Sequence, residues 1–408
     1  MLDSAEASLR RDVRIIGLVG SAHFFSHFFQ LVLPPLFPIL KEELGVPYVA
    51  LGLVMGVFFA ASGIGQTVSG FLVDRWGAAR VLLAGMGLLA GAMAAIGLTH
   101  SYGALLGVAI LAGLGNSVFH PADYSIFNAS VNARRLGRAY SVHGICGNLG
   151  WTVAPAVVVG LTGRYGWRTA LMIVGALGLA AVAMLATRAH LLAEGGGRVA
   201  ARAMGRPRSL ADDLRLLTAA PILAAFGYFT LLAISLIGMQ TFSVAALIAI
   251  YHVPLGLATG ALTAMFLGSA LGVLAGGLLA DRTSRHHVVA ASGMTAGAVL
   301  ALVLASAAPP AALLPVVMAL AGFCLGSTSP SRDMLVRAAT PPGASGKVYG
   351  FVYSGLDLGS SLTPLAFGWL LDHGEPRAVF VMAAVFMLLT IATVVQVRRH
   401  GVPAVARA

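Results

Sequence analysis

Titratable side chains lie within long apolar stretches of this sequence. The stretch SVFHPADYSIFNASV, residues 117–131, carries His120 and Asp123, and the next apolar stretch carries His143. Titratable groups at membrane depth are costly, so a membrane protein that keeps them usually uses them. Histidine, with an unperturbed pKa of about 6.5, and a carboxylate both suit proton exchange. These residues therefore predict a site that binds and releases protons.

Two further histidines, His23 and His27, are four positions apart and share one helical face. Together with His120 and His143 they have three possible roles. Neutral imidazole is a common transition-metal ligand, but no cluster of Cys or Met completes a metal-binding set. Histidines of membrane helices also hydrogen-bond neighbouring helices, and they bind substrates or protons. We assign these histidines to substrate or proton coupling and assign no metal ligands.

A weak internal repeat relates the two halves of the chain. Pro121 and Pro330 are 209 positions apart, and the same offset matches Asp123 with Arg332. In a functional role, Arg332 binds an anionic group or balances the charge of Asp123 during proton exchange. In a structural role, the two residues form an ion pair near the cytoplasmic end. Asp357 either binds the substrate or a proton, or it hydrogen-bonds the backbone of a broken helix. The predicted coupling residues are His23, His27, His120, Asp123, His143, Arg332 and Asp357.

The composition indicates an all-α polytopic membrane protein. Only 10% of the residues are charged and 58% are hydrophobic, whereas soluble domains have roughly 25% charged residues. Apolar runs of about 20 residues are long enough to cross a bilayer as helices. Twelve spans are predicted at residues 14–40, 47–72, 79–98, 102–127, 137–160, 167–187, 219–249, 255–280, 287–307, 311–336, 346–371 and 377–396.

The positive charges predict the orientation of these spans. With a cytoplasmic N-terminus, 21 of the 26 Lys and Arg fall on the cytoplasmic side and four on the other, with Arg332 inside the membrane. This bias places both termini in the cytoplasm and explains the net charge of +11 without nucleic acid. A polar linker at 188–218 separates two predicted six-helix bundles, 1–187 and 219–408.

Two short motifs occur at equivalent positions of the two halves. GFLVDRWGAAR, residues 70–80, lies between spans two and three, and GLLADRTSR, residues 277–285, lies between spans eight and nine. With these motifs the sequence resembles the major facilitator superfamily. The resemblance implies two pseudo-symmetric bundles around a central cavity, alternating access, and a gating role for the motifs. The implied cytoplasmic gating residues are Gly70, Asp74, Arg75, Gly77, Arg80, Gly277, Asp281 and Arg282.

A finer resemblance is to the branch that includes fosmidomycin-resistance-like transporters. FHPADYS in span four, PPLFP at residues 34–38 and YGFVYSGLDLGSSLTP at residues 349–364 carry it. We therefore expect a secondary active transporter of the inner membrane, a proton-coupled exporter of a small anionic or amphiphilic solute. The basic Arg332 favours an anion.

Two other hypotheses remain open. One is a transition-metal or metal-chelate transporter that uses the histidines. The other is a membrane enzyme or receptor on the same scaffold, but the sequence has no GxxxxGK[ST] motif and no nucleophile with a base and an orienting group. We expect no enzyme activity and no cofactor. The expected partners are the solute, protons and the lipid bilayer, with no nucleic acid, and the expected state is a monomer.

Overall fold

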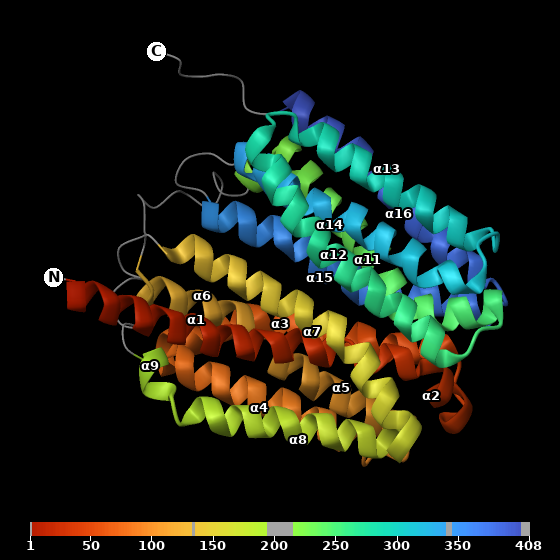
Figure 1. Ribbon diagram of the computed structural model, residues 1–408, viewed down its shortest axis with the longest axis horizontal. Coiled ribbons are helices and arrows are strands. Elements are labelled where there is room, and N and C mark those ends of the chain that lie inside the picture. The colour runs from red at the N-terminus through yellow and green to blue at the C-terminus, as the bar shows by residue number, and fades with distance from the viewer. Residues whose placement is uncertain (1, 133–134, 194–214, 340–344, 401–408) are drawn as a thin grey trace. The chain divides into compact units, whose positions relative to one another are not determined.

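The computed structural model describes residues 2–132, 135–193, 215–339 and 345–400 (Figure 1). Within these ranges the regular structure is helical, with no strand. Eleven helical segments of the described chain are long and apolar enough to cross a membrane. The predicted span 346–371 falls on a further helix, Ser345–Asp372. The predicted all-α membrane architecture is therefore confirmed.

The chain divides into two compact units, Met1–Val46 with Leu53–Met204, and Pro47–Gly52 with Gly205–Ala408. The helices of the first half are α1 (Leu2–Gln30), η1 (Pro34–Leu36), α2 (Phe37–Leu44), α3 (Tyr48–Trp76), α4 (Ala78–Ile96), α5 (Tyr102–Asn116), α6 (Phe119–Ser130), α7 (Leu136–Tyr165), α8 (Trp167–Ala186) and α9 (Ala189–Ala193). Those of the second half are α11 (Ala220–Tyr251), α12 (Leu255–Arg282), α13 (His286–Ala305), η4 (Ala311–Leu313), α14 (Leu314–Ala339), α15 (Ser345–Asp372) and α16 (Pro376–His400). The domain boundaries 1–187, 188–218 and 219–408 stay a prediction, and linker residues 194–214 lie outside the described ranges.

The helices of each unit pack in defined pairs, and one close contact depends on glycine. In the first unit α1 packs on α7, and α4 packs on α5 and α8; in the second unit α12 packs on α14, and α11 packs on α15 and α16. On α7, a Cβ atom at Gly150 would collide with the carbonyl oxygen of Phe24 on α1. Glycine at this position lets the two backbones approach, as is common between membrane helices.

The predicted span 102–127 falls on one apolar helical segment, Tyr102–Ser130, which contains a short break in the helix. Helix α5 ends at Asn116 and helix α6 begins at Phe119. Pro121 has no N–H, so it cannot donate the helical hydrogen bond to the carbonyl group of Ser117. Backbone of this kind at membrane depth is found where it is buried in protein or lines a cavity. Ser117 and Val118 form this break, and His120 is the second residue of α6.

Candidate functional site

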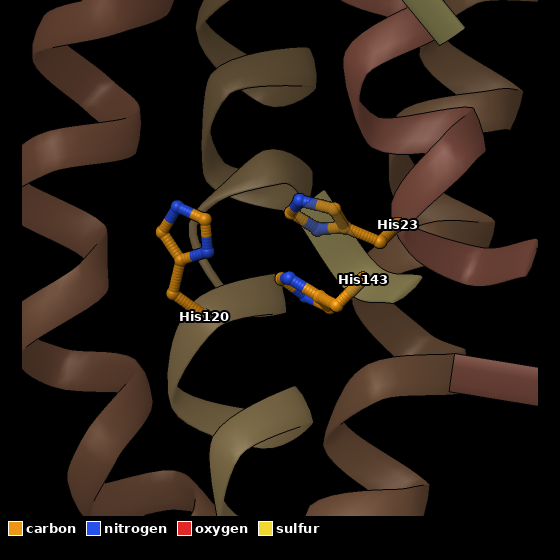
Figure 2. Close-up of side chains that lie close together, drawn as sticks. All are labelled: His23, His120 and His143. Atoms are coloured by element: carbon orange, nitrogen blue, oxygen red, sulfur yellow. The ribbon is translucent and has the colours of Figure 1, made fainter. Parts of the chain in front are cut away.

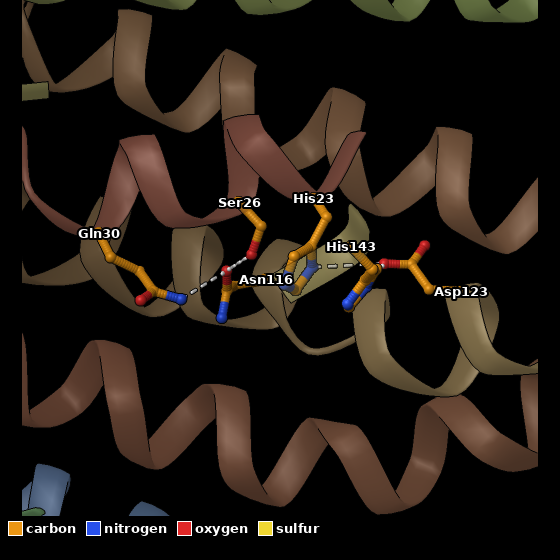
Figure 3. Close-up of polar contacts among 6 residues, drawn as sticks. All are labelled: His23, Ser26, Gln30, Asn116, Asp123 and His143. Carbon is orange, nitrogen blue, oxygen red and sulfur yellow. Dashed lines mark hydrogen bonds and ion pairs between the residues drawn. The ribbon is translucent and has the colours of Figure 1, made fainter. Parts of the chain in front are cut away.

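A buried carboxylate on α6 contacts imidazoles from two other helices. Nε2 of His143 on α7 lies 2.9 Å from Oδ2 of Asp123. Nδ1 of His23 on α1 lies 3.4 Å from the same oxygen. Asp123 is fully buried, and both histidines are buried as well. Figure 3 shows the carboxylate and the two rings meeting between the three helices.

The histidine rings form one cluster. The rings of His23 and His143 are stacked, with centroids 3.5 Å apart and an interplanar angle of 22°. His27 lies 4.3 Å from His23 on the same helix, and His120 lies 5.4 Å from His23. Figure 2 shows His120 beside the His23 and His143 rings, to their left in this view. His120 is exposed whereas His23 and His143 are buried, so it lies at the accessible edge of the cluster.

The spacing of these residues and one glycine place them together. His23 and His27 share a face of α1, and His120 and Asp123, three positions apart, share a face of α6. On α7, a Cβ atom at Gly147 would lie 2.6 Å from Nδ1 of His27 and 3.1 Å from Cδ2 of His23. Position 147 therefore needs glycine for the imidazoles to fit against α7.

The hydrogen bond between His143 and Asp123 contains one hydrogen atom. Either the imidazole N–H donates to the carboxylate, or a protonated carboxyl group donates to the imidazole. The other carboxylate oxygen, Oδ1, is buried and makes no hydrogen bond to the described residues. A desolvated carboxylate with so few partners needs a proton or a cation to compensate its charge. The arrangement is chemically suited to bind and release a proton.

A second polar cluster, which the sequence analysis missed, continues along α1. Asn116, at the end of α5, accepts a hydrogen bond from Ser26 Oγ at 2.8 Å and donates one to Ser62 Oγ on α3 at 2.9 Å. Gln30 Nε2 lies 3.4 Å from Asn116 Oδ1, and Gln30 Oε1 accepts from the Trp151 indole at 3.1 Å. Figure 3 shows Ser26, Gln30 and Asn116 on one side of the His23 and His143 rings and Asp123 on the other. We name Ser26, Gln30, Ser62, Asn116 and Trp151 the amide cluster.

One sequence signal pointed to this cluster. His23, Ser26 and Gln30 are at helical positions i, i+3 and i+7 and so share one face of α1. The partner, Asn116, lies in an apolar stretch with no such pattern. Its role depends on how α5 packs against α1, which the sequence pattern does not determine.

Three imidazoles also lie close enough to share a metal ion. Nitrogen atoms of His23, His120 and His143 all lie within 4.8 Å of one another. A metal ion binds an imidazole nitrogen in the plane of the ring, about 2.0–2.1 Å away for zinc. The nearly parallel planes of His23 and His143 do not converge at such a point, and Nε2 of His143 already contacts Asp123. Metal binding would require these two rings to reorient.

The second unit contains the other predicted coupling residues. Nε of Arg332 on α14 lies 2.9 Å from Oδ1 of Asp333, and its guanidinium group lies 4.7 Å from the centre of the Phe229 ring on α11. Tyr353 on α15 donates a hydrogen bond to the same Asp333 oxygen at 3.1 Å. Asp357 on α15 is half-buried. The pairing of Arg332 with Asp123 joins residues of different units and stays a prediction.

The first gating motif lies where α3 ends and α4 begins. Asp74, Arg75 and Arg80 are exposed. Gly77 has φ of +86°, a conformation that side chains with a Cβ atom rarely adopt. In the second motif, Arg282 is exposed at the end of α12, Gly277 is half-buried, and the side chain of Asp281 lies outside the described residues. The gating role of both motifs stays a prediction.

The fold and the matched motifs agree with a sequence comparison. The family model "Major Facilitator Superfamily" matches residues 19–266 and 228–407, which together cover nearly the whole chain. The protein therefore belongs to the major facilitator superfamily. Its matches are transporters rather than enzymes, in agreement with the expectation from the sequence.

Two relatives match along almost their whole length. The "Fosmidomycin resistance protein" of Escherichia coli (strain K12) is 25% identical over 409 residues, which cover 94% of this chain and 93% of that protein. The "Uncharacterized MFS-type transporter YfnC" of Bacillus subtilis (strain 168) is 28% identical and covers 92% of this chain and 91% of its own length. The predicted resemblance to the fosmidomycin-resistance-like branch is confirmed.

Solved structures show the same fold. One is a bacterial homologue of the human lysosomal transporter Spinster, in an inward-facing and unoccupied conformation. It superposes with a TM-score of 0.77 at 15% identity, over 95% of this chain and 97% of the homologue. The nucleoside transporter NupG superposes with a TM-score of 0.73 at 15% identity, over 96% of this chain and 99% of NupG. The protein is a multi-pass membrane protein with the fold of these transporters.

Proposed function

We propose that the protein is a secondary active transporter that couples the movement of a small solute to protons, as an antiporter that works by alternating access. The observation that supports proton coupling is the fully buried carboxylate of Asp123, 2.9 Å from His143 and 3.4 Å from His23. Intramembrane ionisable groups of this kind commonly belong to proton relays.

The proposed relay uses the difference in exposure within the histidine cluster. A proton enters at the exposed His120 and reaches Asp123 through His23 or His143. The carboxylate and His143 come from different helices, α6 and α7, so movement between these helices changes the free energy of the shared proton. Binding of the solute to one conformation then loads the proton, and the opposite conformation releases it.

The proposed solute is a small anionic or amphiphilic compound that is moved outward. Arg332 is a cation on α14, within the membrane span Ala311–Leu335, and its side chain is only 16% exposed. Asp333 already pairs with its Nε, but a guanidinium group has further N–H donors that can bind an anionic group of the solute. The name of the Escherichia coli relative, a resistance protein, supports efflux over uptake.

The proposed placement follows the charge bias of the sequence. The protein lies in the inner membrane as a monomer, with both termini in the cytoplasm. The bundles 1–187 and 219–408 move about the linker 188–218, and the motifs at Asp74 and Asp281 gate the cytoplasmic side. The solute, protons and lipid are its partners.

Proton flux in proteoliposomes tests this function. An imposed pH gradient is combined with phosphonates, organic acids, amphiphilic drugs and divalent metal ions in turn, and a pH-sensitive dye inside the vesicles reports proton movement. An anionic or amphiphilic compound that moves protons only in vesicles with the protein supports the proposal. Solute movement that neither needs nor dissipates the pH gradient contradicts proton coupling.

A transition-metal or metal-chelate transporter is the second candidate, because nitrogen atoms of His23, His120 and His143 lie within 4.8 Å of one another. The same assay separates the two candidates. Proton movement with Zn²⁺, Ni²⁺ or Co²⁺ but with no anion would favour metal transport.

A further inference from the structure

A cavity of about 540 Å³ is lined by residues of the first unit. Its walls come from α3 and α4, and its inner end comes from the last turn of α5 and the two residues that follow it. This volume falls in the range of about 300–1,000 Å³ that is typical of ligand pockets. The cavity is separate from the histidine cluster, since none of its lining residues belongs to that cluster.

The cavity has an apolar body and a cationic end. Large exposed apolar side chains line the body, including Ile64, at 73% exposed, and Leu88 and Leu114. At the end formed by the first gating motif lie Trp76 and Arg80, both exposed. Tryptophan is enriched where membrane helices meet the headgroup region. The cavity is therefore complementary to an amphiphile with an anionic head.

The polar groups of the inner wall satisfy one another. The hydroxyl groups of Ser69 and Ser117 are hydrogen-bonded at 3.0 Å, and Ser117 also donates to the carbonyl of Leu114 at 2.7 Å. Among the described residues that line the cavity, Arg80 is the one charged side chain. The inner wall therefore suits a hydrocarbon chain better than a polar solute.

The charges around the open end favour an anion. Arg80 lines the cavity, and Arg75 lies one residue before Trp76 on the same exposed segment. The single carboxylate of this segment, Asp74, is outnumbered by the two arginines. Anionic phospholipids of the cytoplasmic leaflet attract such cations with about 1 kcal/mol per Lys or Arg.

We propose that this cavity binds one anionic phospholipid, with an acyl chain between α3 and α4 and the headgroup phosphate paired with Arg80. The proposal goes beyond the transport function and does not depend on the identity of the solute. The chain would end against Ser117 and Val118, which separate α5 from α6. The lipid would thus contact the interruption that precedes His120.

Fluorescence quenching in vesicles tests the proposal. Trp151, Trp167 and Trp369 are changed to Phe, which leaves Trp76 at the cavity as the single tryptophan. The full-length protein is reconstituted with brominated phosphatidylglycerol or brominated phosphatidylcholine at equal mole fractions. We expect stronger quenching of Trp76 by the brominated anionic lipid. Equal quenching by the two lipids would overturn the proposal.

Charge variants show whether the preference comes from the cavity. Arg80→Gln should lower the relative binding constant for phosphatidylglycerol about fivefold, as expected from the loss of one cation near an anionic surface. Arg75→Gln removes the same charge from a residue that does not line the cavity, so it should retain most of the preference. An equal loss in both variants would mean a diffuse surface charge effect and would overturn the specific site.

A volume variant tests the site for the acyl chain. Ala84 is exposed and lines the cavity, so Ala84→Phe should fill it and reduce quenching by both lipids. Gly91→Phe is the matched control, because Gly91 lies on the same helix, does not line the cavity and has open space around its Cβ position. Unchanged quenching in Ala84→Phe, in protein that elutes normally from gel filtration, would contradict an acyl chain in this cavity.

Discussion

His143 and Asp123 are joined through Nε2 and Oδ2, which lie 2.9 Å apart in a buried environment. The two residues come from α7 and α6, so the hydrogen atom between them connects two helices that need not move together. His23, on α1, lies 3.4 Å from the same oxygen. A single carboxylate is therefore the meeting point of three helices, and its protonation state is sensitive to how these helices pack.

Asp123→Asn should abolish proton-coupled transport while the protein still folds. The amide has the same shape as the carboxyl group and hydrogen-bonds to His143, but it does not exchange a proton. We expect proton-driven flux to fall about tenfold or more, as for the loss of an obligatory intramembrane proton carrier. Exchange of solute for solute, which needs no net proton movement, should persist. Unchanged proton-driven flux in proteoliposomes would contradict the coupling role of Asp123.

The hydrogen bond between Asp123 and His143 can be measured with a double-mutant cycle. His143→Ala leaves the buried carboxyl group with one partner fewer and should destabilise the protein, whereas the same change in the Asp123→Asn background should cost less. We expect a coupling energy of about 1–3 kcal/mol, the range for buried hydrogen bonds to groups that can carry charge. Thermal unfolding in detergent gives the stabilities of the unchanged protein, the two single variants and the double variant. Additive effects would show that the two side chains do not interact.

Asn116→Leu should remove the centre of the amide cluster. Ser26 and Ser62 would lose their hydrogen-bond partner, and each buried polar group without a partner costs about 1–3 kcal/mol. We expect a lower melting temperature. Asn148→Leu is the control, because Asn148 bonds to the backbone of its own helix at Gly144. Equal stability losses in both variants would argue against a special role for the amide cluster.

Much of the architecture could be predicted from the sequence because the membrane imposes simple rules. Apolar runs of sufficient length predict helices, and the two motifs at residues 70–80 and 277–285 predict two related halves. His23 with His27, and His120 with Asp123, could be grouped because helical spacing places each pair on one face. These rules act within one helix and concern its length, composition and faces.

The missed features depend on contacts between helices. Asn116 lies in an apolar stretch without a polar pattern, and its partners are 90 and 54 residues away in the sequence. Gly147 is one of 50 glycines, and only the packing of α7 on α1 shows that it faces His27. The interruption after α5 follows from Pro121, but its position beside Ser69 and the lipid cavity depends on how α3 packs there.

Gly77→Ala tests the turn between α3 and α4. Gly77 has φ of +86°, and a residue with a Cβ atom in such a region costs about 1–3 kcal/mol. Gly70→Ala is the control from the same motif, because a Cβ atom at Gly70 meets no heavy atom within 4 Å and its backbone has no such φ. We expect Gly77→Ala to lower the melting temperature and Gly70→Ala to leave it almost unchanged. Equal stabilities would mean that the turn adopts another conformation.

Gly147→Ala should displace the histidines that lie against α7. The added methyl group would lie 2.6 Å from Nδ1 of His27, so the ring or the helix must move, and overpacking of this kind costs about 1–3 kcal/mol. Gly144→Ala, one turn earlier on α7, places its methyl group in open space and should be neutral or stabilise the helix by up to about 1 kcal/mol. Proton flux and thermal unfolding are measured for both variants. Since neither change alters a titratable group, a loss of proton flux confined to Gly147→Ala would show that transport depends on the position of the imidazoles and not only on their presence. Full proton flux in Gly147→Ala would contradict that dependence.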